Sequence, residues 1–315
     1  MSPSIRIVFM GTPDFAVPSL TALIQEKYDV VTVVTQPDRP KGRKKVITPT
    51  PVKVVAERYG IPVFQPEKLR DPVNVEKVLS YQPDLIVTAA YGQILPESLL
   101  KVPKYGCINV HASLLPKYRG GAPIHQAIID GEEETGVTIM YMVKALDAGD
   151  MIAQRAIPIT ETDHVGTMHD KLSQVGAELL TETLPPLLKG ELTPIAQDET
   201  QVTYAPNIKR DDEKIDWSRS AKQLTNQIRG LHPWPVAFTV WHGKPFKIWW
   251  AHVLEESADA IPGTVKRVDE EGIVVSTGEG CLKLTDIQPA GKKRMSVSEF
   301  IRGHQMEAGE RLGDE

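Results

Sequence analysis

The chain of 315 residues lacks several features that would assign it to a class of protein. Its only cysteines, Cys107 and Cys281, lie far apart without the spacing of a metal site, which disfavours a disulfide scaffold and indicates a reducing compartment. No apolar run approaches the ~18 residues of a membrane-spanning helix. The start of the chain has neither the apolar core nor the cleavage site of a signal peptide. We therefore expect a cytoplasmic protein without a membrane segment.

Glycine-rich phosphate loops are also missing. After the first apolar run, GTPDFAVP (11–18) supplies one glycine where a dinucleotide fingerprint needs G-x-G-x-x-G, and no G-x-x-x-x-G-K-[ST] motif occurs. A dinucleotide site is therefore disfavoured. The histidines form no metal set, because His164 and His169 would fall on different faces of a helix and no carboxylate pair completes the ligands. We expect no metal.

The composition that remains is that of an ordinary globular protein. Hydrophobic residues make up 41% and charged residues 24%, which excludes a disordered or fibrous class. The length predicts two domains. The net charge of −5 argues against a wholly basic nucleic-acid coat, although it does not describe local patches.

Apolar runs rich in β-branched residues alternate with helical segments in the first part of the chain. This alternation predicts an α/β fold with a doubly wound, mostly parallel sheet that helices cover on both faces. The expected strands include residues 5–9, 29–35, 84–90 and 106–110. Ligands bind such sheets beyond the carboxyl ends of their strands, and the stretch INVHASLLPKYRGG (108–121) leaves a strand at that end.

The chain is predicted to divide into a domain over 1–190, a linker over 191–207 and a second domain over 208–315. The linker is polar, contains proline and shows no periodicity. The last part holds short strands separated by glycine and aspartate turns. These indicate a small barrel or sandwich of the oligonucleotide-binding-fold kind, two forms that the pattern alone does not distinguish.

Asn109 and His111 form a polar pair at the end of an expected strand. They alternate with Val110, so both side chains point to the same side of an extended backbone. An asparagine can donate to a developing oxyanion and a histidine can exchange a proton near neutral pH, the two needs of acyl transfer. The alternative, that both only satisfy the last backbone groups of the strand, is equally common.

Asp147, in the turn LDAGD, is a candidate third member of this group. It can fold toward His111, fix the tautomer and stabilise the imidazolium. An aspartate before Ala-Gly is also a common turn residue that caps its own backbone. Spacing alone leaves the two interpretations level.

Two stretches together, INVHASLLPKYRGGAPI and GVTIMYMVKALDAGDMI, resemble the formyltransferase family that uses 10-formyltetrahydrofolate. The resemblance runs from about Ile5 to the final helix. It implies a Rossmann-like formyltransferase fold followed by a smaller β-barrel domain. One departure is Val236, where the family pattern has glycine, and this puts the shape of that turn in doubt. The shared features are Asn-x-His, SLLP followed by Arg-Gly, and Gly136, Thr138, Asp147 and Gly149.

The resemblance implies formyl transfer from 10-formyltetrahydrofolate to the α-amino group of initiator methionyl-tRNA, for translation initiation, by a monomer without metal. Asn109 and His111 would hold the oxyanion and shuttle the proton, with Asp147 orienting His111. The SLLP stretch can also be a turn with a buried leucine pair, a reading that suits Leu115. The residues implied to bind the folate are Ser113, Leu114, Leu115, Pro116, Ala90, Tyr91, Gly92 and Ile94.

A basic segment, residues 36–53, stands out in the acidic chain. Alone, such a segment is most often a solvated loop. With the resemblance, it indicates a flexible loop that contacts the tRNA acceptor stem, with Arg43 as the leading reader. The second domain, with 16 Lys/Arg against 17 Asp/Glu from residue 208 onward, binds tRNA by the resemblance and not by its charge. The segment has one acid, Asp38, against Arg39, Lys41, Arg43, Lys44, Lys45 and Lys53.

Two other functions remain as alternatives. The same site could formylate an amino sugar on a nucleotide, or the chain could be a non-catalytic RNA-binding protein on this scaffold. The basic segment favours RNA over a sugar nucleotide. The presence of Asn109, His111 and Asp147 counts against a non-catalytic protein.

Overall fold

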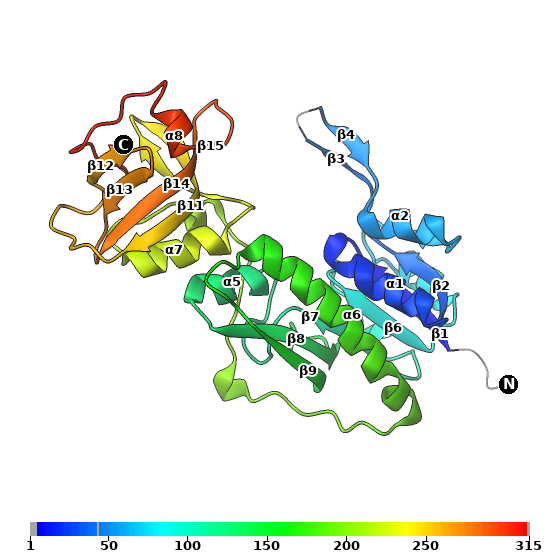
Figure 1. Ribbon diagram of the computed structural model, residues 1–315. Coiled ribbons are helices and arrows are strands. Elements are labelled where there is room, and N and C mark those ends of the chain that lie inside the picture. The colour runs from blue at the N-terminus through cyan, green and yellow to red at the C-terminus, as the bar shows by residue number, and fades with distance from the viewer. Residues whose placement is uncertain (1–4, 43, 314–315) are drawn as a thin grey trace. The chain divides into compact units, whose positions relative to one another are not determined.

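A computed structural model describes residues 5–42 and 44–313 (Figure 1). The chain falls into two compact units that do not follow its linear order. Unit 1 holds residues up to 120, 134–157 and 169–204, and unit 2 holds 121–133, 158–168 and the residues from 205 onward. The domain limits expected from the sequence, 1–190, 191–207 and 208–315, stay a prediction. No helix within the described residues is both long and apolar enough to cross a membrane.

Unit 1 is built on a seven-stranded sheet, which confirms the predicted doubly wound, mostly parallel architecture. The first five strands along the sheet are parallel, and the next strand runs antiparallel to its neighbour. All residues of the central strand β6 are buried, as expected for a sheet covered on both faces. In sheet order the strands are β5 (Val63–Phe64), β2 (Asp29–Val34), β1 (Arg6–Gly11), β6 (Leu85–Ala89), β7 (Cys107–His111), β8 (Glu134–Tyr141) and β9 (Met151–Pro158).

Helices pack on both faces of this sheet. On one face, Val75, Val78 and Leu99 join the buried side chains of β1 and Cys107 in one apolar cluster. On the other, α6 approaches so closely that a Cβ added at Gly176 would lie 2.8 Å from Val110 Cγ1. The helices that contribute to unit 1 are α1 (Val17–Gln25), α2 (Pro51–Arg58), α3 (Pro72–Leu79), α4 (Glu97–Leu100) and most of α6 (Val165–Lys189).

The basic segment is a two-stranded hairpin and not the flexible loop expected from its sequence. Strands β3 (Arg39–Lys41) and β4 (Val46–Thr48) pair antiparallel and extend away from α2 (Figure 1). The three consecutive β-branched residues of β4 favour an extended backbone, which explains the difference. Arg43, the expected reader of RNA, lies outside the described residues.

Unit 2 contains an antiparallel sheet whose first and last strands are both hydrogen-bonded to residues 310–313. Val265 N donates to Glu310 O and Gly313 N donates to Val240 O, so residues 310–313 bind the strands at both ends of the path. The predicted small barrel is consistent with this closure. Along the path the strands are β10 (Ala237–Trp241), β11 (Lys244–Leu254), β14 (Cys281–Pro289), β13 (Gly272–Ser276) and β12 (Val265–Asp269), with β15 (Met295–Ser296) beside β14.

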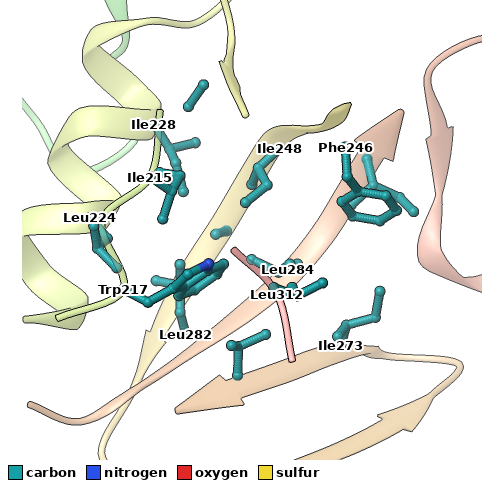
Figure 2. Packing of buried hydrophobic residues seen from close by; sticks show 14 of the residues in the cluster. Ile215, Trp217, Leu224, Ile228, Phe246, Ile248, Ile273, Leu282, Leu284 and Leu312 are labelled. Carbon is teal, nitrogen blue, oxygen red and sulfur yellow. The ribbon is translucent and has the colours of Figure 1, made fainter. Parts of the chain in front are cut away.

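One helix of unit 2, α7 (Ala221–Gly230), fills the inner side of this sheet (Figure 2). Its residues Leu224 and Ile228 belong to the same buried cluster as Ile248 and Leu284. The helix begins with a capping box in which Ser220 and Gln223 satisfy each other's backbone groups, which fixes where it starts. Unit 2 also holds α5 (Pro123–Asp130) and α8 (Val297–Phe300).

Val236 occupies the turn where the family pattern has glycine. Its φ of +83° lies in the left-handed region, which a β-branched residue rarely adopts. The side chain is only 3% exposed, so apolar burial offsets part of the backbone strain. The turn therefore keeps the conformation that glycine would allow.

His232 makes the stability of unit 2 depend on pH. Burial, and then the nearby His164 and Arg294, lower the pKa of its imidazole, while Nδ1 lies 3.0 Å from the Trp249 carbonyl. As the pH falls through about 6.5, the unfolded chain takes up a proton that the folded unit resists. We expect the free energy of unfolding to fall between pH 7.5 and 5.5, measured by urea denaturation.

A His232→Asn variant serves as the comparison, because asparagine keeps a donor near the position of Nδ1 and does not titrate. It should lose less stability over the same pH interval than the unchanged chain. Equal losses would show that His232 is not the group responsible.

Candidate active site

Strand β7 carries Asn109 and His111 on one side of the sheet, as their spacing predicts. Asn109 is paired in register with Thr88 of β6, and His111 with Thr138 of β8. His111 is 5% exposed and Asn109 is partly exposed. The two side chains therefore lie at the carboxyl end of a strand between two neighbours, where parallel sheets bind ligands.

The amide of Asn109 is oriented by its neighbour on β6. Thr88 Oγ1 donates to Asn109 Oδ1 at 2.7 Å, so Thr88 holds the oxygen end of the amide. Within the described residues, no hydrogen bond uses Asn109 Nδ2. Two N–H donors on a fixed amide are thus left for a ligand.

The two nitrogens of His111 face different partners. Nε2 lies 3.0 Å from the carbonyl oxygen of Tyr118, and because a carbonyl only accepts, Nε2 carries the proton in the neutral ring. Nδ1 lies 3.7 Å from Asp147 Oδ2. Nδ1 is therefore the nitrogen that can take up a proton, and the imidazolium it forms would face a carboxylate.

Asp147 reaches this position from the connection between β8 and β9. Its backbone is left-handed, with φ +47°, and its Oδ2 accepts a hydrogen bond from Gly120 N at 2.8 Å. The carboxylate thus ties its loop to the segment after β7 rather than capping its own turn. The structure brings Asp147 and His111 together, while their catalytic roles stay a prediction.

The SLLP turn is held by the strand beside it. Thr138 Oγ1 donates to Ser113 O at 2.7 Å and accepts from Leu115 N at 3.1 Å, while Gln154 Nε2 donates to Leu115 O at 2.8 Å. Ser113 and Leu115 are buried, whereas Leu114 and Pro116 are partly exposed. A buried side chain is what the alternative reading expected for Leu115. Folate binding by these four residues stays a prediction.

The predicted folate residues after β6 differ in exposure. The Tyr91 side chain is buried in the core, where burial raises the pKa of its phenol, and its carbonyl accepts from Thr12 Oγ1 at 2.9 Å. Ala90 and Gly92 have positive φ and are exposed, and Ile94 is 83% exposed. Tyr91 would therefore act through its backbone, as Gly92 must because it has no side chain.

Ion pairs occupy two of the basic residues in or beside the hairpin. Arg39 lies 2.5 Å from Glu67, and Lys53 lies 2.7 Å from Asp38. The hydrogen bond from Lys53, followed by one from Gln65, holds the pKa of Asp38 below its ordinary range. These contacts anchor the base of the hairpin.

Lys44 and Lys45 are exposed at the hairpin and have no ion pair within the described residues. The backbone of Lys41 belongs to β3, but its side chain lies outside the described part of the chain. Of the predicted RNA contacts, Lys44 and Lys45 are thus the described residues whose charge is available to a partner.

Two buried polar residues near Asp147 were not predicted from the sequence. Gln197 Nε2 donates to the carbonyls of Asp147 and Gly149, at 2.7 and 2.8 Å, and its Oε1 accepts from Arg119. Arg119 follows the SLLP stretch in a motif that the sequence did single out. Gln197 lies in the expected linker, where nothing in the local pattern distinguishes it from its polar neighbours.

Across residues 5–42 and 44–313, no group of three or more histidine, cysteine, aspartate or glutamate side chains is placed to hold a metal ion. Cys107 is buried, and burial raises the pKa of its thiol to about 12. This keeps Cys107 protonated and a poor nucleophile.

Comparisons with known proteins show which family the chain resembles. Residues 5–184 match a family model described as formyl transferase, and residues 207–305 match the formyl transferase C-terminal domain. The chain is 61% identical to the methionyl-tRNA formyltransferase of Halalkalibacterium halodurans over 98% of both chains. It is 62% identical to that of Bacillus subtilis, also over 98% of both chains.

Solved structures share the fold at lower identity. An N-formyltransferase from Helicobacter canadensis, in complex with folinic acid and dTDP-3-aminofucose, aligns with a TM-score of 0.65 at 20% identity, covering 89% of this chain and 99% of that one. HypX from Aquifex aeolicus, in complex with tetrahydrofolic acid, aligns with a TM-score of 0.64 at 20% identity, over 95% of this chain and 47% of that one.

Proposed function

This chain belongs to the formyl transferase family, and we propose that it transfers the formyl group of 10-formyltetrahydrofolate to the α-amino group of initiator methionyl-tRNA. The support is the identity of about 60% with methionyl-tRNA formyltransferases along nearly the whole chain, together with the Asn109–His111–Asp147 arrangement. The product, N-formylmethionyl-tRNA, would serve translation initiation. A monomer in the cytoplasm stays the accompanying prediction.

The proposed reaction is an attack of the amino nitrogen on the formyl carbon. A new C–N bond forms, the carbonyl becomes a tetrahedral oxyanion, and the bond from the formyl carbon to the folate nitrogen then breaks. Asn109 Nδ2, which no hydrogen bond within the described residues uses, would donate to the oxyanion. This assigns the Asn109 amide to the charge that develops.

Proton transfer falls to His111. Its Nδ1 would accept the proton that the amine loses and return it to the folate nitrogen as that nitrogen leaves. Nε2 would keep its hydrogen bond to Tyr118 O throughout, so the ring would not need to turn. Asp147, 3.7 Å from Nδ1, would stabilise the transient imidazolium.

Exposed apolar side chains mark where the folate would lie. Ile94 follows β6 and is 83% exposed, while Val143 and Leu146, in the connection that carries Asp147, are 45% and 60% exposed. An aromatic ring system that covers such side chains gains from removing them from water. We place the pterin between these two segments, against the backbone at Ala90 and Gly92.

An amino-sugar nucleotide is the alternative acceptor, since sugar formyltransferases share the fold. The basic hairpin favours RNA. The deciding experiment supplies 10-formyltetrahydrofolate with either methionyl-tRNA or an amino-sugar nucleotide and follows formyl incorporation. Modification of the sugar alone would overturn the proposal. Modification of neither would favour a non-catalytic RNA-binding protein.

The hairpin lysines provide a test of tRNA binding. Replacing Lys44 and Lys45 by alanine should raise KM for methionyl-tRNA and lower the dependence of log K on log salt by about 1 per lost phosphate contact. The KM for the folate should not change. Initial rates over a range of salt concentrations measure both.

Lys101 and Lys104, two exposed lysines elsewhere in unit 1, give the matched control. Their double alanine variant removes the same charge and should leave the KM for methionyl-tRNA and its salt dependence unchanged. If both double variants behave alike, the hairpin has no specific role.

A further inference from the structure

The segment 195–204, which we name the strap, crosses two loops of unit 1. Ile195 pairs with Met151 through two backbone hydrogen bonds of 2.8 Å. Thr203 O accepts from Arg119 N, and Thr203 Oγ1 accepts from Tyr118 N, both at 2.9 Å. The loop after β7 supplies the Tyr118 carbonyl that contacts His111 Nε2, and the connection between β8 and β9 supplies Asp147. The strap therefore joins the two sources of His111's partners.

Gln197 makes the contact nearest to Asp147. Its Nε2 donates to Asp147 O at 2.7 Å and to Gly149 O at 2.8 Å, and its Oε1 accepts from Arg119 Nε and Nη2 at 3.0 and 2.9 Å. The residue is 9% exposed and Arg119 is 3% exposed. Both amide hydrogens and both lone pairs of the oxygen are thus used, which only an amide in this orientation can do.

These bonds restrain a backbone that is unfavourable on its own. Asp147 has a φ of +47°, a left-handed conformation that a non-glycine residue keeps only where its surroundings enforce it. The carboxylate makes one further anchoring bond, from Gly120 N at 2.8 Å. Gln197 fixes the peptide of Asp147 and Gly120 fixes its side chain.

We propose that Gln197, held by Arg119, is a positioning residue that sets the distance between Asp147 and His111. The inference rests on the proposed function, since it concerns the same proton transfer. Without the two bonds from Gln197, the loop would relax and the carboxylate would leave the position from which it stabilises the imidazolium. The chemical step slows, whereas binding of methionyl-tRNA does not depend on this loop peptide. The KM for the folate is expected to rise as well, because the pterin is placed against Val143 and Leu146 of the same connection.

The test compares Gln197→Met with Gln201→Met. Gln201 lies in the same strap, is exposed, and its side-chain amide donates to Asp198. Because small misplacements of reacting groups cost up to about 100-fold, we expect Gln197→Met to lower kcat by about 10- to 100-fold, with the KM for methionyl-tRNA within about twofold. Gln201→Met should match the unchanged chain. A rise in KM with constant kcat would overturn the proposal.

A double-mutant cycle shows whether Gln197 acts through Asp147. In an Asp147→Asn background, Gln197→Met should lower kcat by less than about threefold, because the charge it positions is already gone. If the double variant lost kcat by the product of the two single effects, Gln197 would act independently of Asp147 and the proposal would be wrong. Gln197→Glu, which turns an oxygen toward two carbonyls, should be at least as slow as Gln197→Met.

An observation that needs no turnover separates this inference from the proposed function. The ring C–H resonance of His111, assigned by its loss in His111→Gln, should shift in Gln197→Met in the same direction as in Asp147→Asn. If methionyl-tRNA is not formylated, the proposed function fails, and this resonance still decides the inference. An unmoved resonance in a folded Gln197→Met protein refutes it.

Discussion

Replacing His111 by alanine is expected to lower kcat by about 1,000-fold, the middle of the range for a group that transfers a proton in the rate-limiting step. Nδ1 is the nitrogen that can take up a proton, since Nε2 donates to the Tyr118 carbonyl. Alanine leaves the amine without an acceptor for its proton. Single-turnover formylation of methionyl-tRNA, at saturating folate, measures the step directly.

His252, an exposed histidine on β11, provides the control for this substitution. Its alanine variant should keep the kcat of the unchanged chain. Near-normal turnover in His111→Ala would remove His111 from the chemistry and leave it as a residue that closes its strand, the alternative that the sequence left open.

The second large effect is expected at Asn109. Loss of one oxyanion donor typically costs about 100-fold or more in kcat, about 2.7 kcal/mol, and Asn109→Ala should show it. Asn109→Asp is the sharper variant, because a carboxylate can still accept from Thr88 but cannot donate to an oxyanion. Both variants should lose kcat with little change in KM, as measured by steady-state formylation.

A different result would reassign Asn109. If Asn109→Asp kept its turnover and Asn109→Ala lost it, the contact with Thr88 would matter and the donor would not. Asn74, a partly exposed asparagine whose amide donates to Lys68 O, is the control. Its alanine and aspartate variants should both keep the kcat of the unchanged chain.

The parts of the site that the sequence predicted depend on local geometry. Asn109 and His111 share one side because the period of a strand is two residues, and no distant contact can change that. The sequence left the role of Asp147 open, because an aspartate in a turn can accept a hydrogen bond from its own turn or from a distant residue. In the structure the Asp147 carboxylate accepts a hydrogen bond from the N–H of Gly120, 27 residues earlier in the chain.

Other features depend on contacts that no local pattern encodes. Gln197 is one polar residue in a polar segment, and only the folded loops give its amide four hydrogen bonds, to Asp147, Gly149 and Arg119. The charged residues of the basic segment favour a solvated loop, whereas the β-branched run of β4 favours the strand that the structure shows. At Val236 the family pattern did indicate an unusual turn, and the structure shows the positive φ that glycine normally provides.

The closure of unit 2 by residues 310–313 is expected to protect the protein from aggregation. The match to the C-terminal family model ends at residue 305, yet the bonds to β12 and β10 come from beyond it. Unpaired strand edges are templates on which other chains add by edge-to-edge aggregation. Residues 310–313 therefore cover the unpaired edges of β12 and β10, so a chain trimmed to the limits of the family match would expose both edges.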